Sequence, residues 1–220
     1  MQIVLLGPPG TSTPELAKKI ASTYQLALIN PNEVLSQIAT ENNDLGHITK
    51  EAREHGRSSD ELTFAALRYQ WPTLKHPAGY LLHDLPQNEH QVELLHSLLA
   101  EENRTVSLVF NLKVDNDALV ERQVGYIQCT HCDAEYNLYT QPPLVDRVCD
   151  DCGGRLKQRP ADYEETISNR LRLYDIQMAP VLAHYDAQHI LIQIPDQGDS
   201  VMTLWRAIQK HIRHYQTAHP

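Results

Sequence analysis

Short apolar runs alternate with helix-like patterns along most of the chain. The first run, residues 2–6, is continuous, contains β-branched Ile3 and Val4, and ends in Gly-Pro-Pro-Gly ahead of a helical pattern over 15–24. Further buried strands are predicted at 26–29, 79–82, 105–112 and 189–194. Further helices are predicted at 32–40, 49–55, 60–69, 90–102, 116–124, 163–186 and 201–214. This order predicts an α/β fold, in which helices cover both faces of a parallel sheet.

One segment, from about residue 126 to 158, departs from this alternation. It carries all four cysteines together with Pro142-Pro143 and Gly153-Gly154. Turn-forming residues at this density do not suit a long helix or a buried strand. The segment is therefore expected to be a small subdomain inserted into the α/β fold.

The composition narrows the class of protein. A chain of 220 residues with 41% hydrophobic and 21% charged residues fits one domain, or one domain carrying an insertion, and excludes disorder and collagen-like repeats. Nineteen basic against 28 acidic residues give 19 − 28 = −9, which opposes binding to a nucleic-acid backbone. No apolar run approaches the roughly 20 residues of a membrane helix, and the opening run carries no basic leader. A cytoplasmic protein with no nucleic-acid or membrane partner is expected.

The cysteines form two C-x-x-C pairs, Cys129 with Cys132 and Cys149 with Cys152, separated by 149 − 132 − 1 = 16 residues. This spacing is typical of a four-cysteine zinc site, and four thiolates leave no open position for catalytic water. A structural Zn²⁺ is therefore expected. The alternatives are a reducible disulfide pair or four free thiols. A zinc ribbon for nucleic acid is disfavoured because five acidic residues surround the cluster, namely Asp133, Glu135, Asp146, Asp150 and Asp151.

Several motifs, taken in chain order, resemble those of adenylate kinases with a four-cysteine lid. They are Gln2-Ile-Val-Leu-Leu-Gly-Pro-Pro-Gly10, Ala17-Lys-Lys-Ile20, Gly79-Tyr-Leu-Leu82 with Pro86 and Gln91, Val120-Glu-Arg-Gln-Val-Gly125, Tyr136 with Pro142-Pro143, and Glu164-Glu-Thr-Ile-Ser-Asn-Arg-Leu171. The resemblance covers essentially the whole chain.

The resemblance implies a nucleoside-monophosphate-kinase-like P-loop fold in three parts. These are a core (1–29, 60–125 and 160–220), a nucleotide-monophosphate-binding region (30–59) and a zinc lid (126–159). It also implies a monomer that binds ATP, ADP and AMP and moves a phosphoryl group between ATP and AMP, using Mg²⁺ and a clamp of cationic side chains.

The phosphate-binding loop departs from the family pattern G-x-P-G-x-G-K-G-T. The chain keeps Gly7 and Gly10, but Thr13 stands where the phosphate-gripping lysine belongs. Pro14 removes a backbone N–H, and Glu15 places a negative charge where the family has a hydroxyl. Each change opposes phosphate binding. The same residues form a good helix start, with Thr13 as the expected N-cap, so Glu15 and Thr13 are expected to supply part of what a bound phosphate supplies in active relatives; neutral decay of an unused site is the alternative.

Three phosphate-contacting arginines of the family are also replaced, and they align with Ser36, Gln87 and Tyr126. The magnesium-side aspartate aligns with His83, and Asp84 could serve only if the backbone slipped by one residue.

Four residues match the family's nucleotide contacts. Arg122 matches the arginine that stacks on the ATP adenine, and Gln91 matches the residue that recognises the AMP base. Arg159 and Arg170 match two arginines of the phosphate clamp. Three of them have a purely structural alternative. Arg122 is then a solvated helix residue, Gln91 a helix-start residue, and Arg170 the partner of Glu164 or Glu165 in an ion pair.

These replacements predict a relative of adenylate kinases that is impaired or inactive in phosphoryl transfer and acts as a nucleotide sensor or as a binding or scaffolding subunit with an unidentified protein partner. One alternative is an active nucleotide kinase whose phosphate grip uses Arg159 and Arg170 with Arg57 or Arg155, in which case Mg²⁺ is required. The other is an interaction module that uses no nucleotide site.

Overall fold

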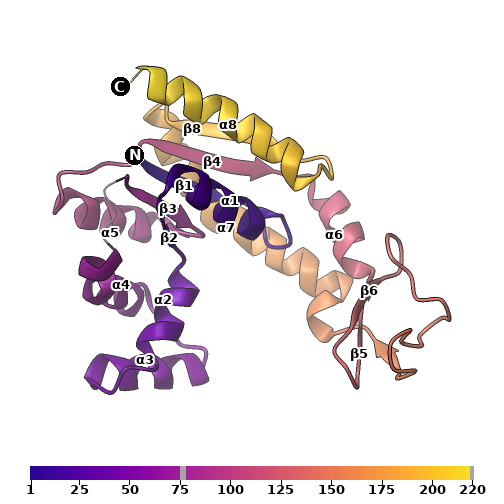
Figure 1. The fold of residues 1–220 in the computed structure, drawn as a ribbon. Helices are drawn as coiled ribbons and strands as arrows, with labels where there is room; N and C mark the ends of the chain where they lie inside the picture. Colours follow the sequence, from indigo (N-terminus) through magenta and orange to yellow (C-terminus); the bar gives the residue numbers. More distant parts are fainter. Residues whose placement is uncertain (75–77, 219–220) are drawn as a thin grey trace. The chain divides into compact units, whose positions relative to one another are not determined.

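A computed structural model describes residues 1–74 and 78–218, and a five-stranded parallel sheet forms its centre (Figure 1). The strand order is β2-β3-β1-β4-β8. These strands are β1 (Gln2–Leu6), β2 (Ala27–Ile29), β3 (Tyr80–His83), β4 (Leu108–Lys113) and β8 (Leu191–Pro195). Every neighbouring pair is parallel, so the predicted α/β class with a parallel sheet is confirmed.

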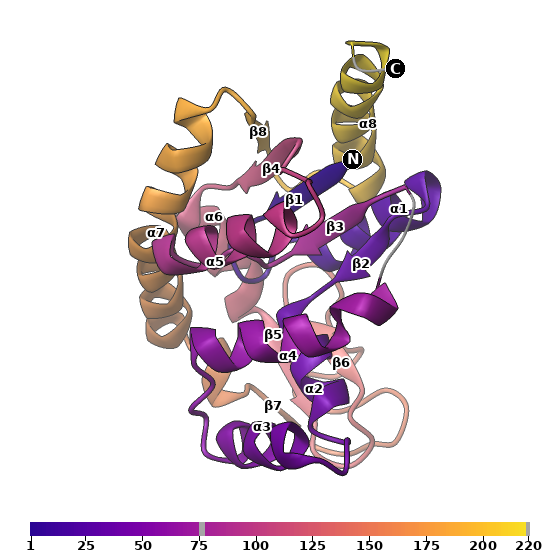
Figure 2. The same cartoon turned by 90° about the vertical axis from the view of Figure 1, so that its left-hand side faces the viewer.

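Eight α-helices are described. They are α1 (Thr13–Tyr24), α2 (Pro31–Ile38), α3 (Asp44–Glu54), α4 (Asp60–Leu74), α5 (Glu89–Ala100), α6 (Asn116–Val124), α7 (Glu164–Ala187) and α8 (Val201–Ala218), with a 3₁₀ turn η1 at Pro160–Asp162. Helices α1 and α8 pack on one face of the sheet through a buried apolar cluster that includes Ile20 and Ile208. Figure 2 shows α5 and the end of α7 on the other side. None of the described helices has the length and apolar character needed to cross a membrane.

Some predicted boundaries were wrong. Strand β4 begins at Leu108 rather than at residue 105. Helix α3 begins at Asp44 rather than at residue 49, because the Asn43 side chain accepts the Gly46 N–H and caps a turn that the sequence analysis left outside the helix.

The inserted segment contains three short strands that the sequence did not predict. They are β5 (Tyr126–Cys129), β6 (Glu135–Asn137) and β7 (Leu156–Lys157), and they form an antiparallel sheet in the order β6-β5-β7. A small apolar cluster around Ile127, Tyr136 and Leu156 packs within it.

The chain divides into two compact units. One comprises residues 1–7, 12–113 and 177–220, and the other comprises residues 8–11 and 114–176. The tip of the first loop thus belongs with α6, the inserted segment and most of α7. The three-part division expected from the family resemblance stays a prediction.

Candidate functional site

The tip of the loop after β1 is a tight turn. The Thr11 N–H and the Thr11 hydroxyl both donate to the Pro8 carbonyl, at 3.2 and 2.8 Å. Gly10 has a φ of +97°, a conformation that L side chains rarely adopt, which accounts for a glycine here.

A side chain that the sequence analysis did not single out, Gln123, lies against this turn. Gln123 is buried on α6, and its Nε2 donates to the Pro9 carbonyl at 3.1 Å and to the Leu119 carbonyl at 3.4 Å. A Cβ atom added to Gly10 would lie 2.4 Å from Gln123 Cδ. The available signal was helical spacing, because Leu119 and Gln123 are four residues apart and share the buried face of α6.

Arg170 on α7 contacts the same amide. Its guanidinium donates to Gln123 Oε1 at 2.6 Å, while its Nε is buried without a hydrogen-bond partner. A buried apolar cluster of Leu119, Ile167 and Leu171 packs α6 against α7 and sets this approach. The alternative of an ion pair with Glu164 or Glu165 was wrong, because in the described chain Arg170 donates to a neutral amide instead.

Arg159 is held by carboxylates of its own unit. Its Nε donates to Asp162 at 2.6 Å and its NH1 to Glu135 at 2.9 Å. The Asp162 hydrogen bond is the main reason that the pKa of the Arg159 guanidinium is raised. The charge of Arg159 is therefore already paired with carboxylates of the protein.

The other two residues matched to nucleotide contacts also bond to protein groups. Arg122 Nε donates to the Ala118 carbonyl at 3.3 Å, one turn earlier in α6. Gln91 is buried and uses both ends of its amide, donating to Asp60 at 2.6 Å and accepting the Gln87 N–H at 2.8 Å. Gln91 thus joins the start of α5 to the start of α4.

His83, which the resemblance aligns with the family's magnesium-side aspartate, is buried at the end of β3. Asn30 Oδ1 accepts the N–H groups of Asn32 and Glu33 at the start of α2, so its Nδ2 is left to donate to His83 Nδ1 at 3.0 Å. The other ring nitrogen of His83, Nε2, lies 3.5 Å from Asp84 Oδ2 and makes no hydrogen bond within the described residues. Burial raises the pKa of the Asp84 carboxyl, partly offset by His83 and Asn30.

These residues do not suit Mg²⁺, which prefers oxygen ligands in octahedral geometry. His83 offers no oxygen, and its Nδ1 already accepts from Asn30. His83 pairs with Leu5 of β1, and the backbone slip that would place Asp84 in its position stays a prediction.

The start of α1 differs from the prediction. The helix begins at Thr13, so Ser12 and not Thr13 is the N-cap residue, and no side chain caps the helix. Ser12 has φ −81° and ψ 24°, outside the extended region in which an N-cap hydroxyl reaches back to the helix. Thr13 is buried, whereas Glu15 is exposed in the first turn.

A cation lies beside Ser36, one of the residues expected to replace an arginine of the family, and the sequence analysis overlooked this cation. Arg53 of α3 donates through NH1 to the Ser36 hydroxyl and, at 3.0 Å, to the Asn32 carbonyl of α2. Because 17 residues separate Arg53 from Ser36, no local spacing could have indicated this contact.

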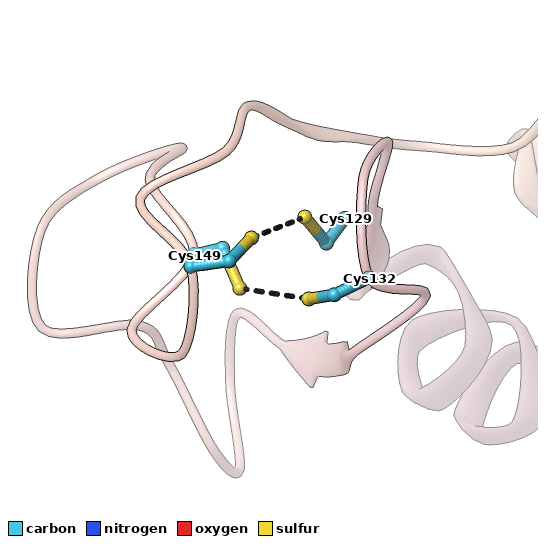
Figure 3. A group of neighbouring side chains, drawn as sticks. Cys129, Cys132 and Cys149 are labelled. Atoms are coloured by element: carbon cyan, nitrogen blue, oxygen red, sulfur yellow. Dashed lines mark hydrogen bonds between the residues drawn. The ribbon is translucent and has the colours of Figure 1, made fainter.

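The four cysteines converge as expected, and Figure 3 shows three of them projecting toward one another. All four sulfur atoms lie within 4.8 Å of one another, with Cys129 3.5 Å from Cys152 and Cys132 3.6 Å from Cys149. A regular tetrahedron with Zn–S bonds of about 2.3 Å has edges of about 3.8 Å, so the group has the size of a zinc site.

Neighbouring groups favour the thiolate of Cys149, whereas hydrogen bonds to other cysteines of the cluster raise the pKa of the Cys132 and Cys152 thiols. The Tyr136 hydroxyl accepts the Asp150 N–H at 2.9 Å and lies 3.5 Å from Cys149 Sγ, and it is the main cause that lowers the pKa of the Cys149 thiol to about 6. The His131 N–H donates to Cys129 Sγ at 3.4 Å. A side chain at Gly154 would lie 3.0 Å from the Cys129 sulfur, so this position requires a small residue. The donor set fits a tetrahedral Zn²⁺.

Comparison with known proteins places these features in a family. A family model described as adenylate kinase matches residues 5–190. The chain is 35% identical to an adenylate kinase of Thermoanaerobacter sp. (strain X514) over 211 residues, which cover 96% of this chain and 97% of that relative. It is 36% identical to one of Geobacillus sp. (strain WCH70) over 200 residues (90% and 93%) and 34% identical to one of Acidothermus cellulolyticus over 216 residues (98% and 99%). With matches that run over nearly the full length of both chains, this protein belongs to the adenylate kinase family.

Proposed function

We propose that this member of the family binds adenine nucleotides but is impaired or inactive in phosphoryl transfer between ATP and AMP, and acts as a nucleotide sensor or as a binding or scaffolding subunit. The observation that carries the proposal is the loss of cations at the phosphate site. Thr13, Ser36, Gln87 and Tyr126 stand where the family has a lysine and three arginines.

Electrostatic stabilisation is the main catalytic contribution in phosphoryl transfer, because the transferring group needs little covalent help. Hydrogen bonds to charged groups contribute about 1.5–3 kcal/mol each, so four lost contacts correspond to roughly 6–12 kcal/mol if they were additive. The two clamp arginines that remain are engaged by protein groups, Arg159 by Asp162 and Glu135 and Arg170 by Gln123.

The proposal includes a structural Zn²⁺ held by Cys129, Cys132, Cys149 and Cys152. The four sulfur atoms, their spacing and the lowered pKa of the Cys149 thiol support it. Such an ion would fix the inserted segment and would take no part in the transfer of phosphate.

A coupled assay for ADP formed from ATP plus AMP tests the loss of activity. The unmodified chain and Arg159→Ala are expected to give the same rate, at the background of the assay, because no working clamp is left to disable. Turnover well above background that falls in Arg159→Ala would refute the impairment.

Calorimetric titration with ATP, ADP and AMP tests nucleotide binding separately. Binding of at least one nucleotide is expected. A chain that binds none of the three would instead be an interaction module.

The second candidate function is an active kinase with a rearranged phosphate grip. Arg53 favours it, since this side chain brings a guanidinium to Ser36, one of the positions that lost an arginine. In that case Arg53→Ala would lower ADP formation at least tenfold. Arg57→Ala, made separately, would measure how much the neighbouring Arg57 contributes to ADP formation.

A further inference from the structure

We infer that the Gln123 amide occupies the place at the tip of the first loop where a nucleotide phosphate would contact Arg170, so that phosphate and Gln123 compete for this arginine. The inference deepens the proposed nucleotide-binding function and rests on it. All residues involved, in the turn 8–11, in α6 and in the part of α7 up to residue 176, belong to one compact unit.

The positive charge of Arg170 is not paired with a carboxylate among the described residues. In the described chain no carboxylate lies within 4 Å of its guanidinium, and its one hydrogen bond goes to the neutral Gln123 amide. Its Nε is buried without a partner. Partial burial of an unpaired guanidinium costs free energy of desolvation. A bound anion would offset this cost through charge-assisted hydrogen bonds.

The orientation of the Gln123 amide is fixed by its neighbours. Nε2 faces the Pro9 and Leu119 carbonyls, and Oε1 faces the guanidinium of Arg170. The reverse orientation would set oxygen against two carbonyls and an NH₂ group against a cation, and is therefore excluded. Gln123 thus bridges the loop and the arginine, and only its contact with the arginine is one that a phosphate oxygen could replace.

The amide also fills the space beside the loop. An added Cβ at Gly10 would meet the Cδ, Nε2 and Oε1 atoms of Gln123 at 2.4, 2.4 and 2.8 Å. A phosphate therefore cannot approach the backbone of Gly10 from this side unless the Gln123 side chain moves away.

The loop presents a carbonyl to this space. The Pro9 carbonyl oxygen accepts from Gln123, so the negative end of the Pro9–Gly10 peptide dipole faces the space that the Gln123 amide fills. It would repel a phosphate oxygen placed in that space. Binding of phosphate then requires both departure of the amide and a turn of the Pro9–Gly10 peptide. An arginine–phosphate pair is charge-assisted and frequently bidentate, so a polyphosphate has the strength to compete.

Calorimetric titration at low ionic strength with ATP and with inorganic tripolyphosphate tests the competition. In Gln123→Leu, whose side chain is of similar size and makes no hydrogen bond, the Kd for both probes is expected to fall about tenfold, the equivalent of about 1.4 kcal/mol for one hydrogen bond to a charged group. Gln123→Glu is expected to weaken binding of both probes, because its carboxylate pairs with Arg170 and repels phosphate.

Two further variants serve as controls. Adding Arg170→Ala to Gln123→Leu should cancel the gain, which locates the bound probe at this arginine. Gln177→Leu, an exposed glutamine on the same helix, should leave both Kd values unchanged. Gln123→Met and the thermal midpoint of each variant guard against misfolding.

An unchanged or weaker affinity in folded Gln123→Leu and Gln123→Met overturns the inference, and so does a gain that survives Arg170→Ala. A loss of affinity in both would make the amide a ligand of phosphate rather than its competitor. The proposed impairment is judged by ADP formation in the unmodified chain, so turnover by that chain would refute the impairment without deciding whether Gln123 competes.

Discussion

Individual side chains that the family resemblance assigns to nucleotide or magnesium contacts are hydrogen-bonded to other protein groups. Arg170 meets Gln123, Gln91 meets Asp60, and His83 meets Asn30. Which cations of the family are replaced stays a prediction, made from the fixed spacing of the motifs. The sequence could not predict the contacts of Gln123 or Arg53, since these join residues 47 and 17 positions apart in the chain.

Gly10 provides a test at this scale. Gly10→Ala should destabilise the protein by about 1–3 kcal/mol through backbone strain, and further through collision with Gln123. Gly56 is the matched control, because its φ of +63° also disfavours a side chain but no atom lies within 4 Å of an added Cβ. Urea unfolding should therefore show a larger loss for Gly10→Ala than for Gly56→Ala.

Adding Gln123→Ala to Gly10→Ala separates the two causes. In the Gln123→Ala background, Gly10→Ala should lower the free energy of unfolding by no more than Gly56→Ala lowers it in the unmodified chain. If the two substitutions were simply additive, Gln123 would not press on Gly10 as the contact distances indicate.

Among the helices, the starts of four differ from the start of α1. Asn30, Asn43, Asn88 and Asp115 have extended backbone and accept N–H groups of α2, α3, α5 and α6 through their side chains. Ser12, ahead of α1, does neither. In a phosphate-binding loop the N–H groups at this position face the ligand rather than a cap.

Alanine substitutions at two of these positions test the difference. Asp115→Ala should lower the free energy of unfolding by about 0.5–2 kcal/mol, because the Ala118 N–H loses its acceptor at 3.0 Å. Ser12→Ala should change it by less than about 0.5 kcal/mol. Chemical denaturation measures both, and equal losses would show that Ser12 caps α1 in solution.

Strands could be predicted from the sequence where a continuous apolar run marks them. The five core strands are short apolar runs, and each was found near its observed position. Helix α3 includes Gly46 although glycine disfavours a helix, because a side chain there would lie 2.1 Å from the Glu41 carbonyl and tight packing requires the glycine. Strands β5 to β7 have two to four residues each and escaped detection because turns hold them together.

At the scale of the molecule, the four-cysteine centre lies in the unit that also contains the loop tip. The inserted segment has only a small apolar cluster, around Ile127, Tyr136 and Leu156, so a bound metal is expected to supply much of its stability.

Removal of metal tests this dependence. Treatment with a chelator under reducing conditions should abolish hydrogen-exchange protection in β5 to β7 while β1, β3 and β4 stay protected, because their apolar contacts do not involve the cysteines. Cys149→Ser should reproduce this pattern without chelator and reduce bound zinc to well below one equivalent. Protection of β5 to β7 that persists in both experiments would show that the segment folds without an ion.

Strand β1 lies in the middle of the core sheet, between β3 and β4, although it is the first strand in the chain. Ile3 is paired with Leu108, so 108 − 3 = 105 residues must be synthesised after Ile3 before this contact can form. At about 5–20 residues per second, the ribosome needs roughly 5–20 s for that stretch. Its other partner, Leu81 of β3, follows after 81 − 3 = 78 residues, so for most of this interval neither neighbour of β1 is available. The nascent chain then exposes an unpaired apolar strand, the kind of surface that chaperones cover.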